Sequence, residues 1–191
     1  MPEILLFHHA YGLTAGCRSF ADDLRAAGHV VHLPDLYEGH TFGNLDEGVG
    51  YAKQVGFDTI IERGRVSAED LPNEIVYGGF SLGVLPAQML AQTRPGARGA
   101  LLLHACVPPS EFGEGWPEGV PVQIHMMEAD PMALEGDLDA ARELADGVDG
   151  AELFLYPGDR HLFSDRSLPD HEEAAATLMT KRVISFLDGL G

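Results

Sequence analysis

Residues Glu74–Gln88 read Glu-Ile-Val-Tyr-Gly-Gly-Phe-Ser-Leu-Gly-Val-Leu-Pro-Ala-Gln, and this stretch organises the rest of the chain. Apolar residues of high β-propensity lead into a pair of glycines, and a segment rich in helix-favouring residues follows the serine. A strand, a sharp turn and a helix around the spacing Gly-x-Ser-x-Gly are typical of a nucleophile elbow. At Gly79 and Gly83 a Cβ atom would collide with the neighbouring strand or helix. We therefore expect Ser81 on a strained turn at the carboxyl edge of a sheet.

The helix that follows Ser81 is expected to begin near Leu82. Pro86 supports this start, because proline is tolerated only in the first turn of a helix, where backbone N–H groups have no intrahelical acceptor. The turn also directs the amide of Leu82 toward the serine hydroxyl, at a helix N-terminus that favours negative charge. A glycine-rich turn that merely joins a strand to a helix would show the same spacing, so the catalytic interpretation needs partners elsewhere in the chain.

Short apolar runs alternate with amphipathic segments along the whole chain. This alternation predicts βαβ crossovers and an α/β fold, in which a mostly parallel sheet of about six strands carries helices on both faces. There is no internal repeat or linker, so residues 1–191 are expected to form a single domain. The expected strands are Glu3–His8, His29–Pro34, Pro72–Gly79, Ala97–His104, Val120–Met127 and Ala151–Tyr156. The expected helices are Thr14–Ala27, Asn44–Gly56, Phe57–Gly64, Leu82–Gln92, Gly136–Gly147 and His171–Leu190.

The composition is that of an ordinary globular protein with an acidic surface. Of the 191 residues, 45% are hydrophobic and 22% are charged, and the formal net charge is −18. That charge argues against binding to nucleic acid or to an anionic membrane, since both require a basic face. No apolar run approaches the length of a membrane span, and no signal-like segment precedes the first strand. Cys17 and Cys106 lack a metal-type spacing, so we expect a cytoplasmic protein with reduced, structural thiols.

Polar residues of catalytic type follow the ends of several expected strands, where ligands bind in a parallel sheet. A serine hydroxyl needs a base that takes its proton, and that base needs an acid that orients it. The chain order in α/β-hydrolases is serine, acid, histidine. Ser81, Asp130 and His161 follow the third, fifth and sixth expected strands in that order. Glu128 is the second choice for the acid, and Asp159 is a further alternative.

The oxyanion that forms when a serine attacks a carbonyl group needs two backbone donors. The amide of Leu82 is expected to supply one, and the amide of Ala10, in the loop after the first strand, the other. His9, Tyr11 and Phe80 are expected to line the substrate pocket beside these donors. For Tyr11, simple packing over the edge of the sheet is the alternative.

With these residues the sequence resembles the dienelactone hydrolase family of α/β-hydrolases over nearly its whole length. The similar segments include His-His-Ala-Tyr-Gly-Leu, Leu-Pro-Asp-Leu-Tyr, Gly-Phe-Ser-Leu-Gly, Val-Pro-Val-Gln-Ile-His-Met-Met-Glu-Ala-Asp-Pro and Tyr-Pro-Gly-Asp-Arg-His-Leu-Phe. The last two mark the acid and histidine loops of that family. The resemblance implies a triad of Ser81, Asp130 and His161, with the amides of Ala10 and Leu82 as the oxyanion hole.

The chain departs from the pattern of that family at three positions. Ser81 stands where the founding enzymes carry cysteine, so the nucleophile needs full assistance from a base. His9 stands where they carry a glutamate. Asp165, four residues after His161, occupies a place where they carry an arginine that holds the substrate carboxylate. The missing arginine and the charge of −18 both argue against a carboxylated lactone as the substrate.

The leading hypothesis is a serine hydrolase of small carboxylic esters or lactones, a monomer or homodimer without a cofactor, that acts through an acyl-enzyme. The chain begins at its first parallel strand, without the antiparallel hairpin common in this fold, and Ala105–Gly119 is too short for a separate cap. An open, shallow pocket is therefore expected. A non-catalytic binding or regulatory protein of the same fold is the alternative. A metal-dependent hydrolase using His8, His9, His104 and Asp35 is a third option, but no metal-ligand spacing such as His-x-x-x-His occurs.

Overall fold

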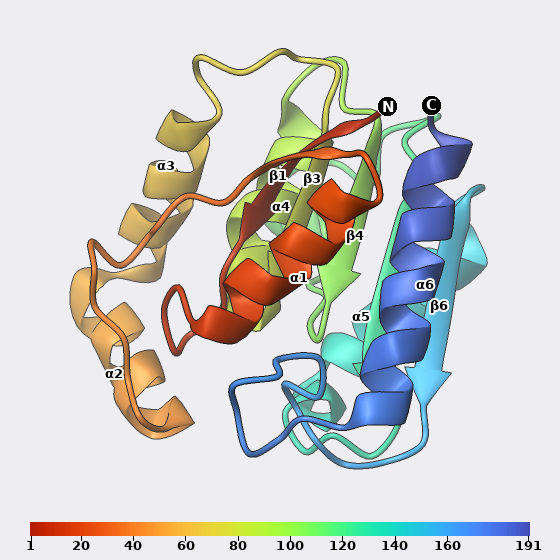
Figure 1. Cartoon of the computed structure of the whole chain (residues 1–191). Helices are drawn as coiled ribbons and strands as arrows, with labels where there is room; N and C mark the ends of the chain where they lie inside the picture. Colours follow the sequence, from red (N-terminus) through yellow and green to blue (C-terminus); the bar gives the residue numbers. More distant parts are fainter.

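The computed structural model describes residues 1–191, in which a six-stranded sheet lies between two layers of helices (Figure 1). The strand order is β2-β1-β3-β4-β5-β6, and every neighbouring pair is parallel, which confirms the predicted α/β-hydrolase type of fold. The strands are β1 (Glu3–Phe7), β2 (Val30–His32), β3 (Val76–Phe80), β4 (Gly99–Leu103), β5 (Val122–Met127) and β6 (Ala151–Tyr156). The helices are α1 (Ala15–Ala26), α2 (Leu45–Val55), α3 (Phe57–Ser67), α4 (Val84–Thr93), α5 (Asp137–Gly147) and α6 (Glu173–Gly189). Three 3₁₀ turns are η1 (Ser81–Gly83), η2 (Pro109–Glu111) and η3 (Ala133–Glu135).

The inner strands β1, β3, β4 and β5 bury both of their faces, because successive side chains point to opposite sides of a sheet that helices cover on both sides, whereas the edge strands β2 and β6 are partly exposed. In β1, Ile4 and Leu6 pack with α1 and α6, while Leu5 and Phe7 pack with the helices of the other face. Figure 1 shows α1 and α6 in front of the sheet and α4 behind it. The continuous apolar runs of the sequence therefore become strands covered on both sides, as the alternation of strands and helices predicts.

Helix starts follow the local capping chemistry. The side chain of Thr14 accepts from the amide of Cys17, and that of Asn44 accepts from the amide of Glu47, at the N-termini of α1 and α2. The last helix begins at Glu173 rather than at His171, because the carboxylate of Glu172 caps its first turn. These side chains satisfy amides that have no acceptor within the helix.

The helix behind Ser81 starts with the 3₁₀ turn η1, and regular α-helix follows from Val84. Pro86 lies in the first turn of α4, where its missing N–H group has no consequence. Gly64 of α3 packs directly against Pro86, where a Cβ on the glycine would overlap the proline ring. This close contact brings α3 against the helix of the elbow.

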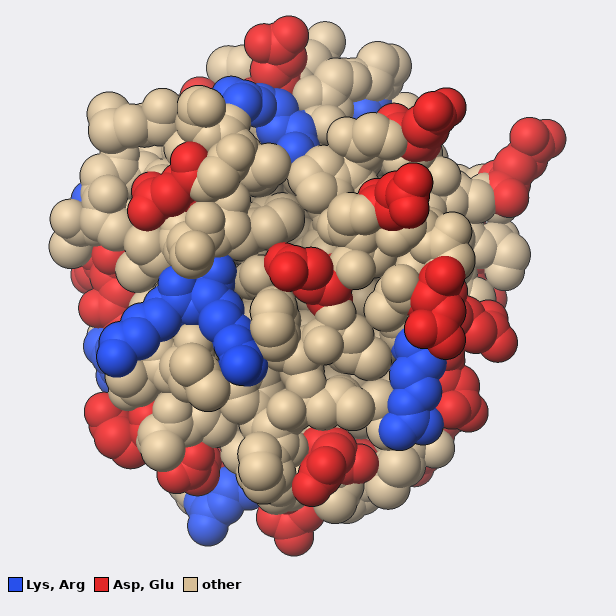
Figure 2. Space-filling view, turned by 90° about the vertical axis from the view of Figure 1, so that its right-hand side faces the viewer, with Lys and Arg blue, Asp and Glu red and all other residues tan.

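On the face drawn in Figure 2 the charged side chains are spread out rather than gathered in one patch. On the side of the molecule that lies to the right in Figure 1, lysines and arginines stand in small separate groups among acidic and uncharged residues (Figure 2). The longest helix, α6, has 17 residues, and no helix combines the length and apolar character that a membrane span needs.

Because all six strands are parallel, their carboxyl ends meet at one edge of the sheet. The arrowheads in Figure 1 point to the lower side of the molecule, where the loops after the strands gather. These loops carry His9 and Ala10 after β1, Ser81 after β3, His104 after β4, Asp130 after β5 and His161 after β6. The topology thus brings chemically active residues from five segments to one edge.

Candidate active site

Ser81 occupies a turn that only two glycines make possible. Its φ is 48°, in the left-handed region that non-glycine residues rarely adopt. A Cβ on Gly79 would overlap the carbonyl oxygen of Gly83, and one on Gly83 would overlap the carbonyl oxygen of Phe7. The strained turn predicted from the sequence is therefore present, and it leaves the Ser81 side chain half-buried at the edge of the sheet.

Ser81, His161 and Asp130 form a continuous chain of hydrogen bonds. Oγ of Ser81 lies 2.7 Å from Nε2 of His161, and Nδ1 of His161 lies 2.6 Å from Oδ2 of Asp130. Since a carboxylate only accepts, Nδ1–H of the histidine donates to Asp130, which leaves Nε2 to accept from the serine hydroxyl. Asp130 is fully buried, and its second oxygen accepts from the amide of Met132 across 2.9 Å. The acid is therefore held rigidly behind the histidine.

The two alternative acids lie elsewhere, and so does His171, a histidine of the same segment. Glu128 and Asp159 are exposed, and neither bonds to His161. His171 lies just before α6, where it contacts Glu173 at 3.0 Å. Of the carboxylates predicted as alternatives, Asp130 is the one that reaches the histidine.

The loop after β1 presents a free amide at the same edge. Ala10 is buried, and its N–H donates to no acceptor within the protein. Its carbonyl oxygen packs so closely against α2 that a Cβ on Gly48 would overlap it. The next carbonyl, of Tyr11, accepts from the amide of Phe42. The amide of Leu82, in the first turn after the elbow, likewise has no intrahelical acceptor.

The three residues predicted to line the pocket differ in their exposure. Tyr11 is half-buried, whereas His9 and Phe80 are 1% and 2% exposed. The rings of His9 and Phe80 are 6.3 Å apart, and both lie beneath the surface of the site rather than on it. Tyr11 is therefore the one of the three with surface available to a ligand.

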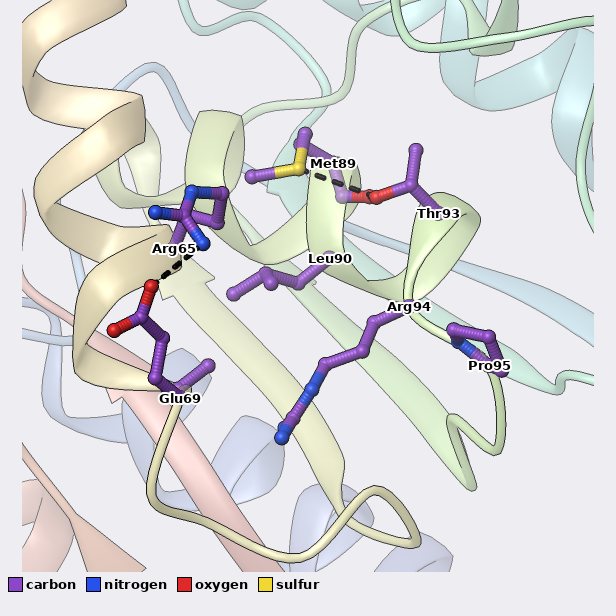
Figure 3. A pocket seen from close by; sticks show the side chains of 8 residues that line it. Arg65, Glu69, Met89, Leu90, Thr93, Arg94 and Pro95 are labelled. Atoms are coloured by element: carbon purple, nitrogen blue, oxygen red, sulfur yellow. Dashed lines mark hydrogen bonds and ion pairs between the residues drawn. The ribbon is translucent and has the colours of Figure 1, made fainter.

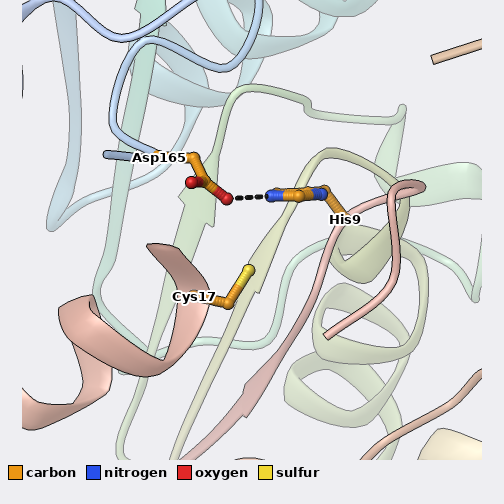
Figure 4. A group of neighbouring side chains, drawn as sticks. All are labelled: His9, Cys17 and Asp165. Carbon is orange, nitrogen blue, oxygen red and sulfur yellow. Dashed lines mark hydrogen bonds and ion pairs between the residues drawn. The ribbon is translucent and has the colours of Figure 1, made fainter. Parts of the chain in front are cut away.

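His9 forms a buried polar cluster with the loop that carries His161. Its Nε2 lies 2.7 Å from Oδ2 of Asp165, and Figure 4 shows the ring directed at that carboxylate with the thiol of Cys17 beside both. Oδ2 of Asp165 also accepts from the hydroxyl of Thr14 across 2.6 Å. Oδ1 accepts from the amide and the hydroxyl of Ser167, across 2.8 and 2.6 Å. The carboxylate is thus saturated with donors.

The cluster holds opposite charges on its two ends. Burial alone would lower the pKa of His9, but Cys17 and Asp165 together raise it to about 9. Burial would raise the pKa of Asp165, but hydrogen bonds from His9, Ser167 and Thr14 hold it well below its ordinary value. His9 and Asp165 therefore form an ion pair at neutral pH.

His9, Cys17 and Asp165 are also the one group of three residues in the protein whose donor atoms could surround a metal ion, within 4.8 Å of one another. Two of these donor atoms, Nε2 of His9 and Oδ2 of Asp165, already bond to each other, however, and an ion would have to displace the proton between them. His8, His104 and Asp35, proposed as ligands alongside His9, do not join this group. The hydrogen bonding favours an ion pair over a metal centre.

Two further titratable residues lie near the site: His104, which the sequence suggested only as a metal ligand, and Asp137, which it did not suggest. His104 is fully buried, Nε2 of its ring lies 2.6 Å from Oγ of Ser164, and its Nδ1 has no partner. Burial, followed by the charge of His161, lowers the pKa of His104 well below its ordinary value. Burial raises the pKa of Asp137 to about 6, and the charge of His161 opposes that increase. The only feature of the sequence that could have suggested a role at the site is their position, after a strand for His104 and at the start of a helix for Asp137. Many surface residues occupy such positions.

The two thiols are free and buried. Burial raises the pKa of Cys106 to about 12, so this thiol stays protonated and inert. Neither cysteine is at the elbow, so Ser81 remains the nucleophile candidate there.

A surface pocket of about 250 Å³ lies between α3 and α4 (Figure 3). Its two arginines are already bonded. Arg65 pairs with Glu62 and Glu69. Arg94 donates to the hydroxyl of Tyr77 and to backbone carbonyl groups of the loop before β3. Arg94 follows the last residue of α4, at the opposite end of the helix from Ser81. The pocket is therefore remote from the site at the carboxyl edge.

Comparison with known proteins identifies one family and its fold. The sequence matches the family described as the dienelactone hydrolase family over residues 1–190. The structure is similar to the crystal structure of a dienelactone hydrolase-like promiscuous phosphotriesterase from metagenomic libraries, with a TM-score of 0.77 and 16% identity, covering 100% of this chain and 87% of that one. A putative dienelactone hydrolase from Klebsiella pneumoniae has a TM-score of 0.68 and 17% identity, with 98% and 87% covered. A thermophilic esterase from Thermogutta terrifontis, bound to propionate, has a TM-score of 0.62 and 17% identity, with 100% and 84% covered.

Proposed function

The chain belongs to the dienelactone hydrolase family of α/β-hydrolases, and from this premise we propose that it is a serine hydrolase of small, uncharged carboxylic esters or lactones. The observation that carries the proposal is the pair of hydrogen bonds through His161. They are 2.7 Å long to Oγ of Ser81 and 2.6 Å long to Oδ2 of Asp130. This is the arrangement in which a histidine activates a serine and a buried carboxylate orients the histidine.

In the first half of the proposed reaction, Oγ of Ser81 attacks the acyl carbon of the ester and its proton moves to Nε2 of His161. The buried carboxylate of Asp130 stabilises the imidazolium that forms. The carbonyl oxygen becomes an oxyanion, which the amides of Leu82 and Ala10 stabilise. The bond to the leaving oxygen then breaks, and His161 donates its proton to the departing alcohol.

In the second half, water attacks the acyl-enzyme. His161 takes a proton from that water, a second tetrahedral oxyanion forms at the same two amides, and the bond to Oγ of Ser81 breaks. The carboxylic acid leaves and the serine hydroxyl regains its proton. The free amide of Ala10, buried and backed by α2, supports its role as a fixed donor.

An apolar groove supports the choice of an uncharged substrate. This groove has a volume of about 360 Å³, and one of its lining residues, Leu85, lies one helical turn after Ser81. Its lining consists of Phe57, Asp58, Ile61, Leu85, Val107, Pro108, Glu111 and Phe112. The apolar side chains fit an alkyl or aryl group of the ester, and the carboxylates of Asp58 and Glu111 repel an anionic one.

Labelling with a fluorophosphonate tests the proposal. In that reaction Oγ of an activated serine bonds to phosphorus and fluoride leaves. We expect a single adduct on Ser81 in the wild-type protein, found by intact mass and peptide mapping, and no adduct in His161→Ala. A well-folded wild-type protein without any adduct would contradict the proposal and favour a non-catalytic binding protein.

A further inference from the structure

We propose that the ion pair of His9 and Asp165 positions the base of the proposed reaction relative to the oxyanion donors. This inference rests on the proposed function. His9 directly precedes Ala10, whose amide is the proposed oxyanion donor, and Asp165 follows the base His161 by four residues. Nε2 of His9 and Oδ2 of Asp165 are 2.7 Å apart. The two catalytic loops, 156 residues apart in the sequence, therefore meet at this ion pair.

The structure around the ion pair is built to accept a charged carboxylate. Asp165 is 4% exposed and receives hydrogen bonds from His9, Thr14 and Ser167. At Gly16 a Cβ would overlap the carboxylate, so the start of α1 leaves space for Asp165 alone. A carboxylate with several short donors is held in one rotamer, which fixes the loop that carries it.

A second anchor holds the same loop without charge. Oγ of Ser164 contacts Nε2 of His104 at 2.6 Å, and the buried ring of His104 is neutral because its pKa is lowered by burial. This anchor ties the histidine loop to β4 but not to the oxyanion loop. The contact between His9 and Asp165, in contrast, joins the residue directly before Ala10 to the loop that carries His161, so it sets the position of the base relative to the oxyanion donor.

The expected effect on catalysis follows from the timing of the interactions. The oxyanion exists only in the transition state and the tetrahedral intermediate, so a displaced donor lowers kcat more than it raises KM. A displacement of about 1 Å between reacting groups costs up to about a hundredfold in rate. Loss of the ion pair should therefore reduce kcat and leave substrate binding in the groove largely intact.

The ion pair also predicts a pH dependence. Several titratable side chains surround the ring of His9. They are Asp165 in the loop after β6, Cys17 in α1, His104 at the end of β4, and His8 and Tyr11 in the same loop as His9. Its charge is retained up to a pH of about 9 and is lost above it. Removal of the negative charge of Asp165 would lower the pKa of His9, so the fall of kcat at alkaline pH would begin at lower pH.

The test compares Asp165→Asn, which keeps the shape of the side chain, with the wild-type protein and with Asp159→Asn. Asp159 is exposed on the same loop and makes no ion pair, so it serves as a matched control. For hydrolysis of p-nitrophenyl acetate we expect Asp165→Asn to lower kcat about tenfold to a hundredfold. We also expect KM to change by less than about threefold and the alkaline limb to shift to lower pH. Asp159→Asn should match the wild type.

Two results would overturn the inference. One is a folded Asp165→Asn variant with unchanged kcat and pH profile, and the other is a lower kcat without any shift of the alkaline limb, which indicates a purely structural role. If Asp165→Asn does not fold, His9→Gln, which keeps an N–H donor without the charge, is judged by the same readouts. Fluorophosphonate labelling of Ser81 in the wild-type protein separates the two proposals. If the wild type forms the adduct but the variants keep wild-type kinetics, only the role of the ion pair is overturned. If the wild type forms no adduct, the proposed function is overturned as well.

Discussion

The amide of Leu36 donates to Nε2 of His8 across 2.9 Å, while Nδ1 of the same ring donates to the carbonyl oxygen of His9 across 2.8 Å. His8 is fully buried, so its ring bridges the loops after β1 and β2 in one neutral tautomer. A second proton would have to be placed on Nε2, where it would face the N–H of Leu36. Burial accordingly lowers the pKa of His8 to about 4.

This bridge predicts a loss of stability in acid. Because the pKa of His8 is lower in the folded protein than in the unfolded chain, its contribution is complete above a pH of about 6.5 and falls as the pH decreases toward 4. Burial also lowers the pKa of His125, to about 3, so this residue likewise reduces the stability of the folded protein in acid. From the pKa shift of His8 we expect the free energy of unfolding, measured in urea, to fall by about 3 kcal/mol between a pH of about 6.5 and a pH of about 4. His8→Gln should be less stable at pH 7 and should show a flatter pH profile; an equal slope would contradict the assignment.

The choice of the acid is tested by a matched pair of variants. Asp130→Asn should lower kcat by about 10⁴-fold, because an amide can hold the histidine in the wrong tautomer and carries no charge for the imidazolium. Glu128→Gln, two residues away on an exposed side chain, should keep nearly all activity. Steady-state hydrolysis of an aryl ester measures both. Comparable activity of the two variants would argue against the proposed triad.

The elbow glycines should be intolerant of a methyl group. In Gly79→Ala and Gly83→Ala the new Cβ would overlap backbone oxygen atoms, which cannot rotate away. We expect each variant to lose several kcal/mol of unfolding free energy, about 3 or more, and ester hydrolysis with it. Gly113→Ala is the control, because nothing lies within 4 Å of its added Cβ and its φ is negative. Thermal unfolding followed by circular dichroism distinguishes them, and a wild-type midpoint in Gly83→Ala would contradict this packing.

The groove predicts selection against anionic substrates. At neutral pH, kcat/KM should be higher for a neutral butyrate ester than for the corresponding monoester of succinate, since the carboxylates of Asp58 and Glu111 repel the second charge. The double variant Asp58→Asn, Glu111→Gln should reduce this preference by about tenfold or less. The preference of the wild type should weaken at high salt concentration. An unchanged ratio in the variant would place the substrate outside this groove.

Much of the fold could be predicted because its signals are local. Strands such as Val122–Met127 and helices such as Ala15–Ala26 follow from apolar runs and from caps within a few residues. The elbow could be recognised because Gly79, Ser81 and Gly83 must be close in sequence to form one turn. The parallel arrangement of the strands followed from their alternation with helices, whereas the order of the strands in the sheet comes from the structure.

The α/β fold, the position of the strained serine and the chain order of Ser81, Asp130 and His161 could all be inferred from the sequence, since each depends on neighbouring residues or on the succession of elements. Three relationships became visible only in the folded protein: Asp130 rather than Glu128 reaches His161, His9 and Phe80 are buried beneath the site, and His9 pairs with Asp165. Many polar residues share one edge of a parallel sheet, and no local spacing states which of them will meet. The packing of loops distant in sequence selects the pairs, because burial leaves a charge or a donor stable only where a partner is within reach.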